Sequence, residues 1–435
     1  MNKQILRLAI PNIISNITIP LLGLVDVGLM GHLDSPDIYI GAVALGGVIF
    51  NILYWAFTFV RMGTSGITAQ NYGGNDPARC MMTLSRALFV CFVGAFILIL
   101  FQTPIEKICF LLLEGESHIE DLARSYFYIR IYAAPAVFAL YAFSGWFIGM
   151  QNSWIPMIIA ISVNILNIVF SYTFVYTFNL HVKGVAWGTL LSQYFGVLIA
   201  LIFLFLRYKI YLRDFSIRIF NELKEFKYFY KINIHIFLRT LCIIFVFTFF
   251  TSKSAASENN IILSVNMILL QFVYMVSYFL DGYAYAGEAL VGKFIGRKEE
   301  NKLLLCIRQL FIWGFFTSAS ITIIYLFKNR FIISVLTDSS IIIETATHYA
   351  LWLILFPLVS FSSFLWDGIY IGATTTKQMF ISMFIATFIF FLPSYYLLYP
   401  KIHNHGLWIA MLLFMFVRGL SQTIIWKKYL VKKRL

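Results

Sequence analysis

The sequence predicts an all-α integral membrane protein with twelve transmembrane helices. Of its 435 residues, 60% are hydrophobic and 12% are charged, whereas a soluble protein averages about 25% charged residues. So few charged groups cannot cover the surface of a globule of this size in water. A spanning helix needs about 20 consecutive, mostly apolar residues, and twelve stretches meet that length. They are residues 6–30, 41–69, 84–103, 124–149, 156–178, 184–206, 232–252, 260–291, 303–327, 342–371, 378–399 and 405–426.

The first of these stretches begins almost at Met1 and contains two prolines and an acid, Pro11, Pro20 and Asp26. It lacks the small-residue cleavage site of a signal peptide, so we expect it to be retained as a helix. Proline interrupts the hydrogen-bonding of a helix and allows a bend. Pro11 and Pro20 are therefore candidate hinge positions.

The basic residues predict the orientation of the chain in the membrane. With both termini placed in the cytoplasm, inner segments carry 21 of the 33 Lys and Arg residues and outer segments carry 7. Such an excess on one side is typical of cytoplasmic loops. The formal net charge of +13 is explained in this way, and no nucleic-acid partner is expected.

The chain divides into two similar halves. We expect lobes at residues 1–206 and 232–435, joined by a charged, amphipathic segment at 207–231 that lies on the inner leaflet. Three matches recur at one constant offset along the chain, which indicates a duplication. They pair 69–73 with 292–296, 145–149 with 368–372, and Tyr126 with Tyr349. Parallel repeats of this kind are typical of transporters, with the substrate path at their interface.

Polar residues within the first half predict a binding pocket. A carboxylate inside a span is costly and is by default a candidate ion or substrate site, so Asp26 is the first candidate. Burial favours the neutral form of a carboxyl group, which suits reversible proton binding. Helical spacing places further polar groups on shared faces, Asn164, Asn167 and Ser171 on one helix and Thr189 on the next. The alternative roles are an Asp26–Arg130 pair and hydrogen bonds between helices.

A second charged group is expected toward the inner side of the membrane. Opposite charges at similar depth usually neutralise one another, so this group suits helix packing or gating better than ion binding. Its members are Arg61, Arg239, Asp281, Glu288 and Asp367.

Several classes of chemistry are not indicated. The five cysteines lack metal-ligand spacing, and no metal site or cofactor is expected. The chain contains no Walker loop, no HExxH and no GxSxG motif, so we expect no enzyme activity.

Longer strings of residues carry a family resemblance. The chain resembles multidrug and toxic compound extrusion (MATE) transporters, specifically their DinF-like branch, over essentially its whole length. The strings are LGLVD (22–26), GHLDSP (31–36), RMGTSG (61–66), TAQ (68–70), GWFIGMQN (145–152), GVAW (184–187), RTLC (239–242), DGYAYAGEALVG (281–292) and DGIYIGAT (367–374).

The resemblance implies two pseudo-symmetric six-helix lobes around a central cavity and the export of amphipathic, often cationic small molecules by alternating access. Asp26 matches the acid of the family's cation site, and Asn167 and Thr189 match further polar members. Pro11 matches the proline where the first helix bends. Ser171 departs from the family pattern, in which an aspartate often stands at this position. A site with one acid suits a proton better than Na+, which prefers several oxygen ligands and more negative charge.

The sequence therefore predicts a monomeric, H+-coupled antiporter of the bacterial inner membrane that acts through Asp26. Two alternatives are a Na+-coupled MATE antiporter and a flippase for lipid-linked precursors. A flippase would be expected to present unpaired cations to pyrophosphate, whereas Arg61, Arg130 and Arg239 each have an acidic neighbour at similar depth.

Overall fold

A computed structural model describes residues 1–112, 116–213, 223–256 and 260–434. Within these ranges the chain forms helices and no strand. Twelve of the described helical stretches are long and apolar enough to cross a membrane, which confirms the predicted all-α membrane fold. The chain forms two compact units, residues 14–230 and residues 1–13 with 231–435. Below they are called the Asp26 unit and the Asp367 unit.

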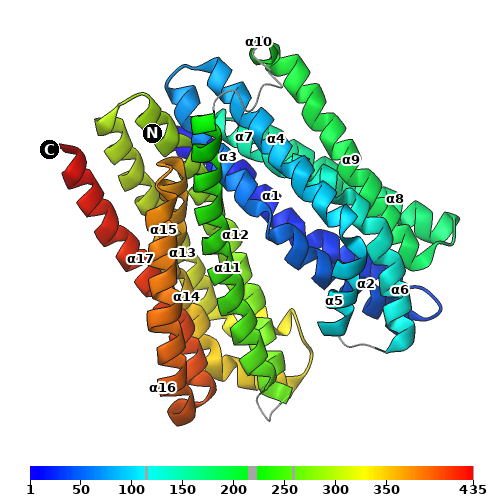
Figure 1. Cartoon of the computed structure of the whole chain (residues 1–435). Coiled ribbons are helices and arrows are strands. Elements are labelled where there is room, and N and C mark those ends of the chain that lie inside the picture. Colours follow the sequence, from blue (N-terminus) through cyan, green and yellow to red (C-terminus); the bar gives the residue numbers. More distant parts are fainter. Residues whose placement is uncertain (113–115, 214–222, 257–259, 435) are drawn as a thin grey trace. The chain divides into compact units, whose positions relative to one another are not determined.

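The Asp26 unit is a helical bundle in which α3 packs on α7 and α8 packs on α9 (Figure 1). Its helices after α1 (Asn2–Met30) are α2 (Pro36–Trp55), α3 (Thr58–Gly73), α4 (Pro77–Leu100), α5 (Gln102–Leu112), α6 (Ser117–Arg130), α7 (Ala134–Gly149), α8 (Trp154–Tyr172), α9 (His181–Arg207) and α10 (Lys209–Leu212). A short 3-10 turn, η1 (Ile131–Ala133), joins α6 to α7, and a π-helical turn, η2 (Thr173–Thr177), extends α8.

The Asp367 unit is a bundle in which α12 and α14 make the most extensive contact. Figure 1 shows α11, α12, α13, α14, α15 and α17 running along one another. The bounds are α11 (Leu223–Ala255), α12 (Asn260–Gly296), α13 (Glu300–Ser334), α14 (Ser340–Gly372), α15 (Thr376–Phe384), η3 (Ile385–Phe391), α16 (Leu392–Ile402) and α17 (Asn404–Arg434). The predicted amphipathic segment at 207–231 lies partly outside the described residues.

The first helix, α1 (Asn2–Met30), contributes to both units. Its residues 1–13 group with the Asp367 unit, so the division differs from the expected lobe of residues 1–206. The reason is close packing against α12, where a Cβ at Gly282 would lie 2.3 Å from Cγ1 of Ile13 and 2.9 Å from the carbonyl oxygen of Ala9. The boundary between the units therefore falls within α1, between Pro11 and Pro20.

The predicted duplication is visible as a repeated helix contact. In the Asp26 unit, a Cβ added to Gly145 of α7 would lie 2.3 Å from the carbonyl oxygen of Arg61 on α3. In the Asp367 unit, a Cβ added to Gly368 of α14 would lie 2.1 Å from the carbonyl oxygen of Ala284 on α12. Gly368 is separated from Gly145, and Ala284 from Arg61, by the same number of residues that separates the matching sequence segments. Only glycine permits such an approach of two helix backbones, so the same packing device is used in each half.

The turns that follow these helices repeat as well. Left-handed backbone conformations occur at Asn75 and Gln151, with φ values of 56° and 63°. At the equivalent positions of the second half, Lys298 and Thr374 have φ values of 58° and 55°. Four non-glycine residues in this uncommon conformation therefore mark two equivalent turns in each half.

Candidate functional site

The candidate site in the Asp26 unit is built on two helices that run alongside each other, α1 and α8. Near one end, Asn164 Nδ2 donates to the carbonyl oxygen of Thr18 at 3.2 Å. Near the other end, Tyr176 Oη donates to the carbonyl oxygen of Leu29 at 2.9 Å. The two contacts are separated by about three helical turns both on α1 and on α8 with η2. The helices therefore run parallel and in step along this length.

Asp26 lies within the paired stretch. It is eight residues beyond Thr18, or about 12 Å along α1, and Ser171 is seven residues beyond Asn164, or about 10.5 Å along α8. The carboxyl group and the hydroxyl group therefore belong to the same level of two neighbouring helices. Asn167 lies one helical turn before Ser171 on the same face of α8.

Three buried oxygen atoms at this site have no hydrogen-bond partner among the described residues. They are Oδ1 of Asp26, Oδ1 of Asn167 and Oγ of Ser171. Asp26 is 8% exposed, and the other two residues are fully buried. The amide of Asn167 is oriented by its donation from Nδ2 to Thr189 Oγ1 at 2.9 Å. Buried acceptors are nearly always satisfied in folded proteins, so unpaired acceptors gathered on adjacent helices indicate a place for a proton, an ion or water.

Arg130 is close enough to Asp26 for electrostatic attraction, but its side chain is held elsewhere. Nη1 of Arg130 donates to the hydroxyl of Tyr126, and the guanidinium lies 5.1 Å from the ring centre of Phe50. Tyr54 Oη donates to the carbonyl oxygen of Arg130 at 2.9 Å, which fixes the backbone at this point. Arg130 therefore provides a positive field near Asp26, while Tyr126 positions its side chain.

The contact between α8 and α9 is unusually close at the level of Ser171. A Cβ added to Gly188 would lie 2.4 Å from Ser171 Oγ and 2.6 Å from its backbone nitrogen. A small side chain at residue 171 is therefore matched by the absence of one at residue 188.

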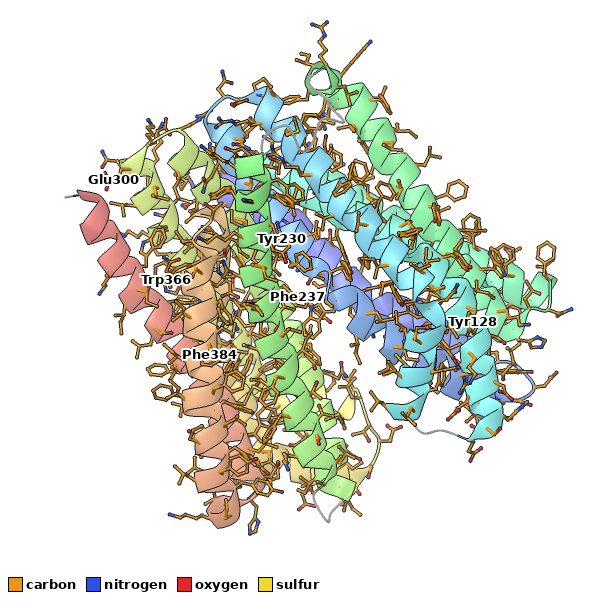
Figure 2. The ribbon with its side chains drawn as sticks, in the orientation of Figure 1. Tyr128, Tyr230, Phe237, Glu300, Trp366 and Phe384 are labelled. Atoms are coloured by element: carbon orange, nitrogen blue, oxygen red, sulfur yellow. The ribbon has the colours of Figure 1, made fainter. Side chains whose placement is uncertain are left out.

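The Asp367 unit contains a second buried acid with very different surroundings. The carboxylate of Asp367 on α14 forms ion pairs with Arg239 of α11 and Arg418 of α17. Gln422, one turn after Arg418, donates from Nε2 to Asp367 Oδ1 at 2.8 Å. Asp367 is 5% exposed and Arg418 is 1% exposed. Trp366, next to the acid, is labelled in Figure 2, and its Nε1 donates to Thr423 Oγ1 at 2.7 Å. Both oxygens of this carboxylate have partners, and these interactions link α11, α14 and α17 to one another.

The structure joins two of the predicted gating residues directly. Arg239 and Asp367 form an ion pair, while Asp281 and Glu288 lie on α12, where both attract Arg239 electrostatically. Arg61 lies on α3, in the other unit. The predicted site residue Asn164 instead links α8 to α1, because its side chain donates a hydrogen bond to the carbonyl oxygen of Thr18.

Sequence reasoning gave no role to Arg418 and Gln422. These two polar residues stand one helical turn apart within the apolar run of α17, and that spacing is the sequence feature that could have identified them as a site.

A set of metal ligands is not found in the described part of the chain. No group of three or more His, Cys, Asp or Glu residues is placed to hold a metal ion there. Asp26, Asn167, Ser171 and Thr189 together supply one carboxylate and a few neutral oxygens. That donor set suits a proton and is poor in charge for a bare metal cation.

Comparisons with known proteins place this geometry in a family. The family model MatE matches residues 11–173 and 236–397, one copy in each half. DNA damage-inducible protein F from Escherichia coli is 34% identical over 98% of this chain and 92% of its own length. The chain belongs to the MATE transporter family. Its similarity to the E. coli protein confirms the predicted DinF-like branch, and the chain is accordingly a transporter.

More distant MATE relatives share the same length and fold. The probable multidrug resistance protein NorM of Photorhabdus laumondii is 24% identical over 98% of this chain and 95% of its own length. Among solved structures, a eukaryotic MATE transporter superimposes with a TM-score of 0.85 at 16% identity, covering 98% of this chain and 95% of that one. An outward-facing multidrug resistance MATE transporter superimposes with a TM-score of 0.82 at 20% identity, covering 99% and 96%. At such identities the likeness establishes the fold.

Proposed function

We propose that this MATE transporter exports amphipathic, cationic small molecules from the bacterial cytoplasm in exchange for protons, with Asp26 as the coupling residue. The observation that carries the proposal is the buried oxygen of Asp26, which has no hydrogen-bond partner among the described residues and lies on the stretch of α1 that pairs with α8. On that part of α8, oxygens of Asn167 and Ser171 likewise lack a partner among the described residues. A carboxylate that is not held by fixed donors can gain and lose a proton, and its charge can attract a cationic substrate.

The mechanism is competition at one carboxylate. When Asp26 is ionised, it attracts a cationic compound from the cytoplasmic side. When it is protonated on the outer side, that attraction is lost and the compound is released. Pro11 and Pro20 flank the boundary between the two units within α1, so bending of this helix offers a means to couple the protonation of Asp26 to a change of access.

The proposed setting is the inner membrane, with both termini in the cytoplasm and a monomeric transporter. The distribution of basic residues supports this orientation, because 21 lie in the segments assigned to the inner side and 7 in those assigned to the outer side. The similarity to an E. coli protein over nearly the whole chain supports a bacterial inner membrane.

Na+ coupling is the competing proposal within the same family. Asn167, Ser171 and Thr189 could contribute neutral oxygens to a sodium ion next to Asp26. The single carboxylate favours the proton, because a dehydrated metal cation gains most from several charged ligands. A flippase of lipid-linked precursors is disfavoured by the engagement of Arg239 and Arg418 with Asp367, since pyrophosphate recognition needs available cations.

The deciding experiment is transport by the purified full-length protein in proteoliposomes, with a fluorescent organic cation and an imposed gradient of H+ alone or Na+ alone. We expect transport with the H+ gradient, its abolition by an uncoupler, and its loss in Asp26→Asn. Equal transport by Asp26→Asn under a proton gradient would refute coupling through Asp26. Transport driven by Na+ alone in the presence of an uncoupler would instead establish the sodium alternative.

A further inference from the structure

A hollow on the surface of the Asp367 unit combines a basic side chain with an apolar floor. It lies between α13 and α14 and has a volume of about 370 Å³. The lining residues are Arg308, Phe311, Ile312, Phe315, Phe316 and Phe361. The hollow is shallow and open on its outer side. None of these lining residues belongs to the Asp26 site or forms an ion pair with Asp367.

The walls of the hollow are built by aromatic packing. Phe361 of α14 stands edge-on to Phe311 and Phe315 of α13, with ring centres 6.2 Å and 6.0 Å apart. Phe315 and Phe316 are exposed by 48% and 61%. These exposed rings therefore form an uneven apolar surface and are not buried between two helices.

The position of Arg308 along α13 gives its depth in the membrane. Arg308 and Lys328 are twenty residues apart, and the nineteen residues between them contain no charged side chain. Twenty residues of α-helix extend about 30 Å, which is the thickness of the hydrocarbon core. Arg308 therefore lies at the boundary between hydrocarbon and headgroups, on the side of Glu300, which is labelled at the start of α13 in Figure 2.

The remaining lining residues continue from that boundary into the hydrocarbon. Arg308, Phe311, Ile312 and Phe315 recur at three- and four-residue spacing and share one face of α13. Phe315 lies about 10 Å deeper than Arg308 along the helix. Because helical side chains lean toward the N-terminus of their helix, the guanidinium leans toward the Glu300 end and the headgroup region.

The charge of Arg308 is available at this surface. Its side chain is exposed, and among the described residues it makes no hydrogen bond or ion pair. An arginine on the lipid-facing surface of a span is costly unless it finds a partner at the interface. A guanidinium binds phosphate oxygens through two parallel hydrogen bonds.

We propose that this hollow binds an anionic phospholipid from the leaflet adjoining the Glu300 end of α13. The lipid phosphate is held by Arg308, and one acyl chain lies along Phe311, Phe315 and Phe361. Ordinary lipid contact needs only an apolar surface. Here an apolar hollow and a cation at headgroup depth lie on one helical face, and together they select a lipid by its charge.

Native mass spectrometry of the delipidated full-length protein tests the proposal. The protein is titrated with phosphatidylglycerol and, separately, with phosphatidylcholine of identical acyl chains. We expect one site that binds phosphatidylglycerol about five- to tenfold more tightly, as the attraction of one basic residue to an anionic lipid predicts. Equal binding of the two lipids by the wild-type protein would overturn the proposal without any variant.

Variants locate the site. Arg308→Gln should lose the preference for phosphatidylglycerol, and Phe315→Ser should weaken binding of both lipids by about threefold or more through lost apolar contact. Arg297→Gln is the matched control, since it removes the same charge from an exposed residue on the same side of the membrane. A preference unchanged in Arg308→Gln, or lost equally in Arg297→Gln, would overturn the assignment.

Two further measurements distinguish a bound lipid from other occupants of the hollow. Inorganic phosphate at millimolar concentration should not displace the lipid, because the acyl chain contributes to binding; displacement would indicate a site for free phosphate. Arg308→Gln should leave the subunit number unchanged. A change of subunit number in that variant would show that a second copy of the chain, not a lipid, covers the hollow.

Discussion

Asp26 and Asp367 are both buried carboxylates inside spanning helices, but their surroundings are opposite. Asp26 has an oxygen with no hydrogen-bond partner among the described residues, and the nearby Arg130 is held by Tyr126. Asp367 accepts from two arginines and from Gln422. A carboxylate between two cations keeps its charge, whereas one with few fixed donors can change it. The comparison separates a residue suited to proton exchange from one suited to holding helices together.

The duplication makes this difference informative. At the offset that relates Gly145 to Gly368, Asp26 corresponds to Phe249 and Asp367 corresponds to Ser144. The close contacts at Gly145 and Gly368 are nevertheless the same in both halves. The two units have therefore kept one packing framework while placing their charged groups at different positions within it.

The largest expected effect on stability is at Asp367. Asp367→Ala leaves Arg239 and Arg418 buried without their acid, which should lower the free energy of unfolding by about 3–5 kcal/mol. Asp26→Asn should change it by about 1 kcal/mol or less, since no fixed ion pair is broken. Reversible unfolding in mixed detergent micelles, followed by circular dichroism, measures both. Equal losses of unfolding free energy in the two variants would contradict the conclusion that only Asp367 holds helices together.

The shared framework predicts a second, equal pair of effects. Gly145→Ala and Gly368→Ala each place a Cβ against a helix backbone, and each should cost about 1–3 kcal/mol of unfolding free energy. Gly47→Ala is the control, because nothing lies within 4 Å of its added Cβ. The same unfolding measurement applies. A loss confined to one of the two contacts would show that the halves do not depend equally on this packing.

A smaller effect concerns the hydrogen bond between Asn167 and Thr189. In a double-mutant cycle of Asn167→Ala and Thr189→Ala, the coupling energy should be about 0.5–1.5 kcal/mol, the usual contribution of one internal hydrogen bond. The four free energies of unfolding give this value. A coupling of zero would mean that the amide of Asn167 is not oriented by Thr189.

The smallest effect is expected at Ser171. Its hydroxyl has no partner among the described residues, so Ser171→Ala should change the free energy of unfolding by less than about 0.5 kcal/mol. Ser192→Ala is the matched control, because that buried hydroxyl donates to the carbonyl oxygen of Thr189 at 2.8 Å; it should cost about 0.5–1 kcal/mol. A larger loss at Ser171 than at Ser192 would show that Ser171 is satisfied in the folded protein.

The sequence by itself determined the membrane class, the twelve spans and the duplication, and it identified Asp26 as the candidate site. These properties depend on composition and on spacing along one chain. An apolar run of sufficient length must span a bilayer, and a carboxylate within such a run is exceptional wherever the helix packs. The family resemblance also rested on contiguous strings of residues, and the comparisons confirmed it.

Only the tertiary structure decided which helices meet. Helical periodicity shows that Asn164 and Asn167 share a face, but it does not show that one amide donates to Thr18 and the other to Thr189. Likewise, the pairing of Arg418 and Gln422 with Asp367 joins helices that are far apart in the chain. The grouping of residues 1–13 with the Asp367 unit depends on the packing of α1 against Gly282. Such pairings follow from the rotation and depth of each helix, which neighbouring helices set and a single sequence leaves open.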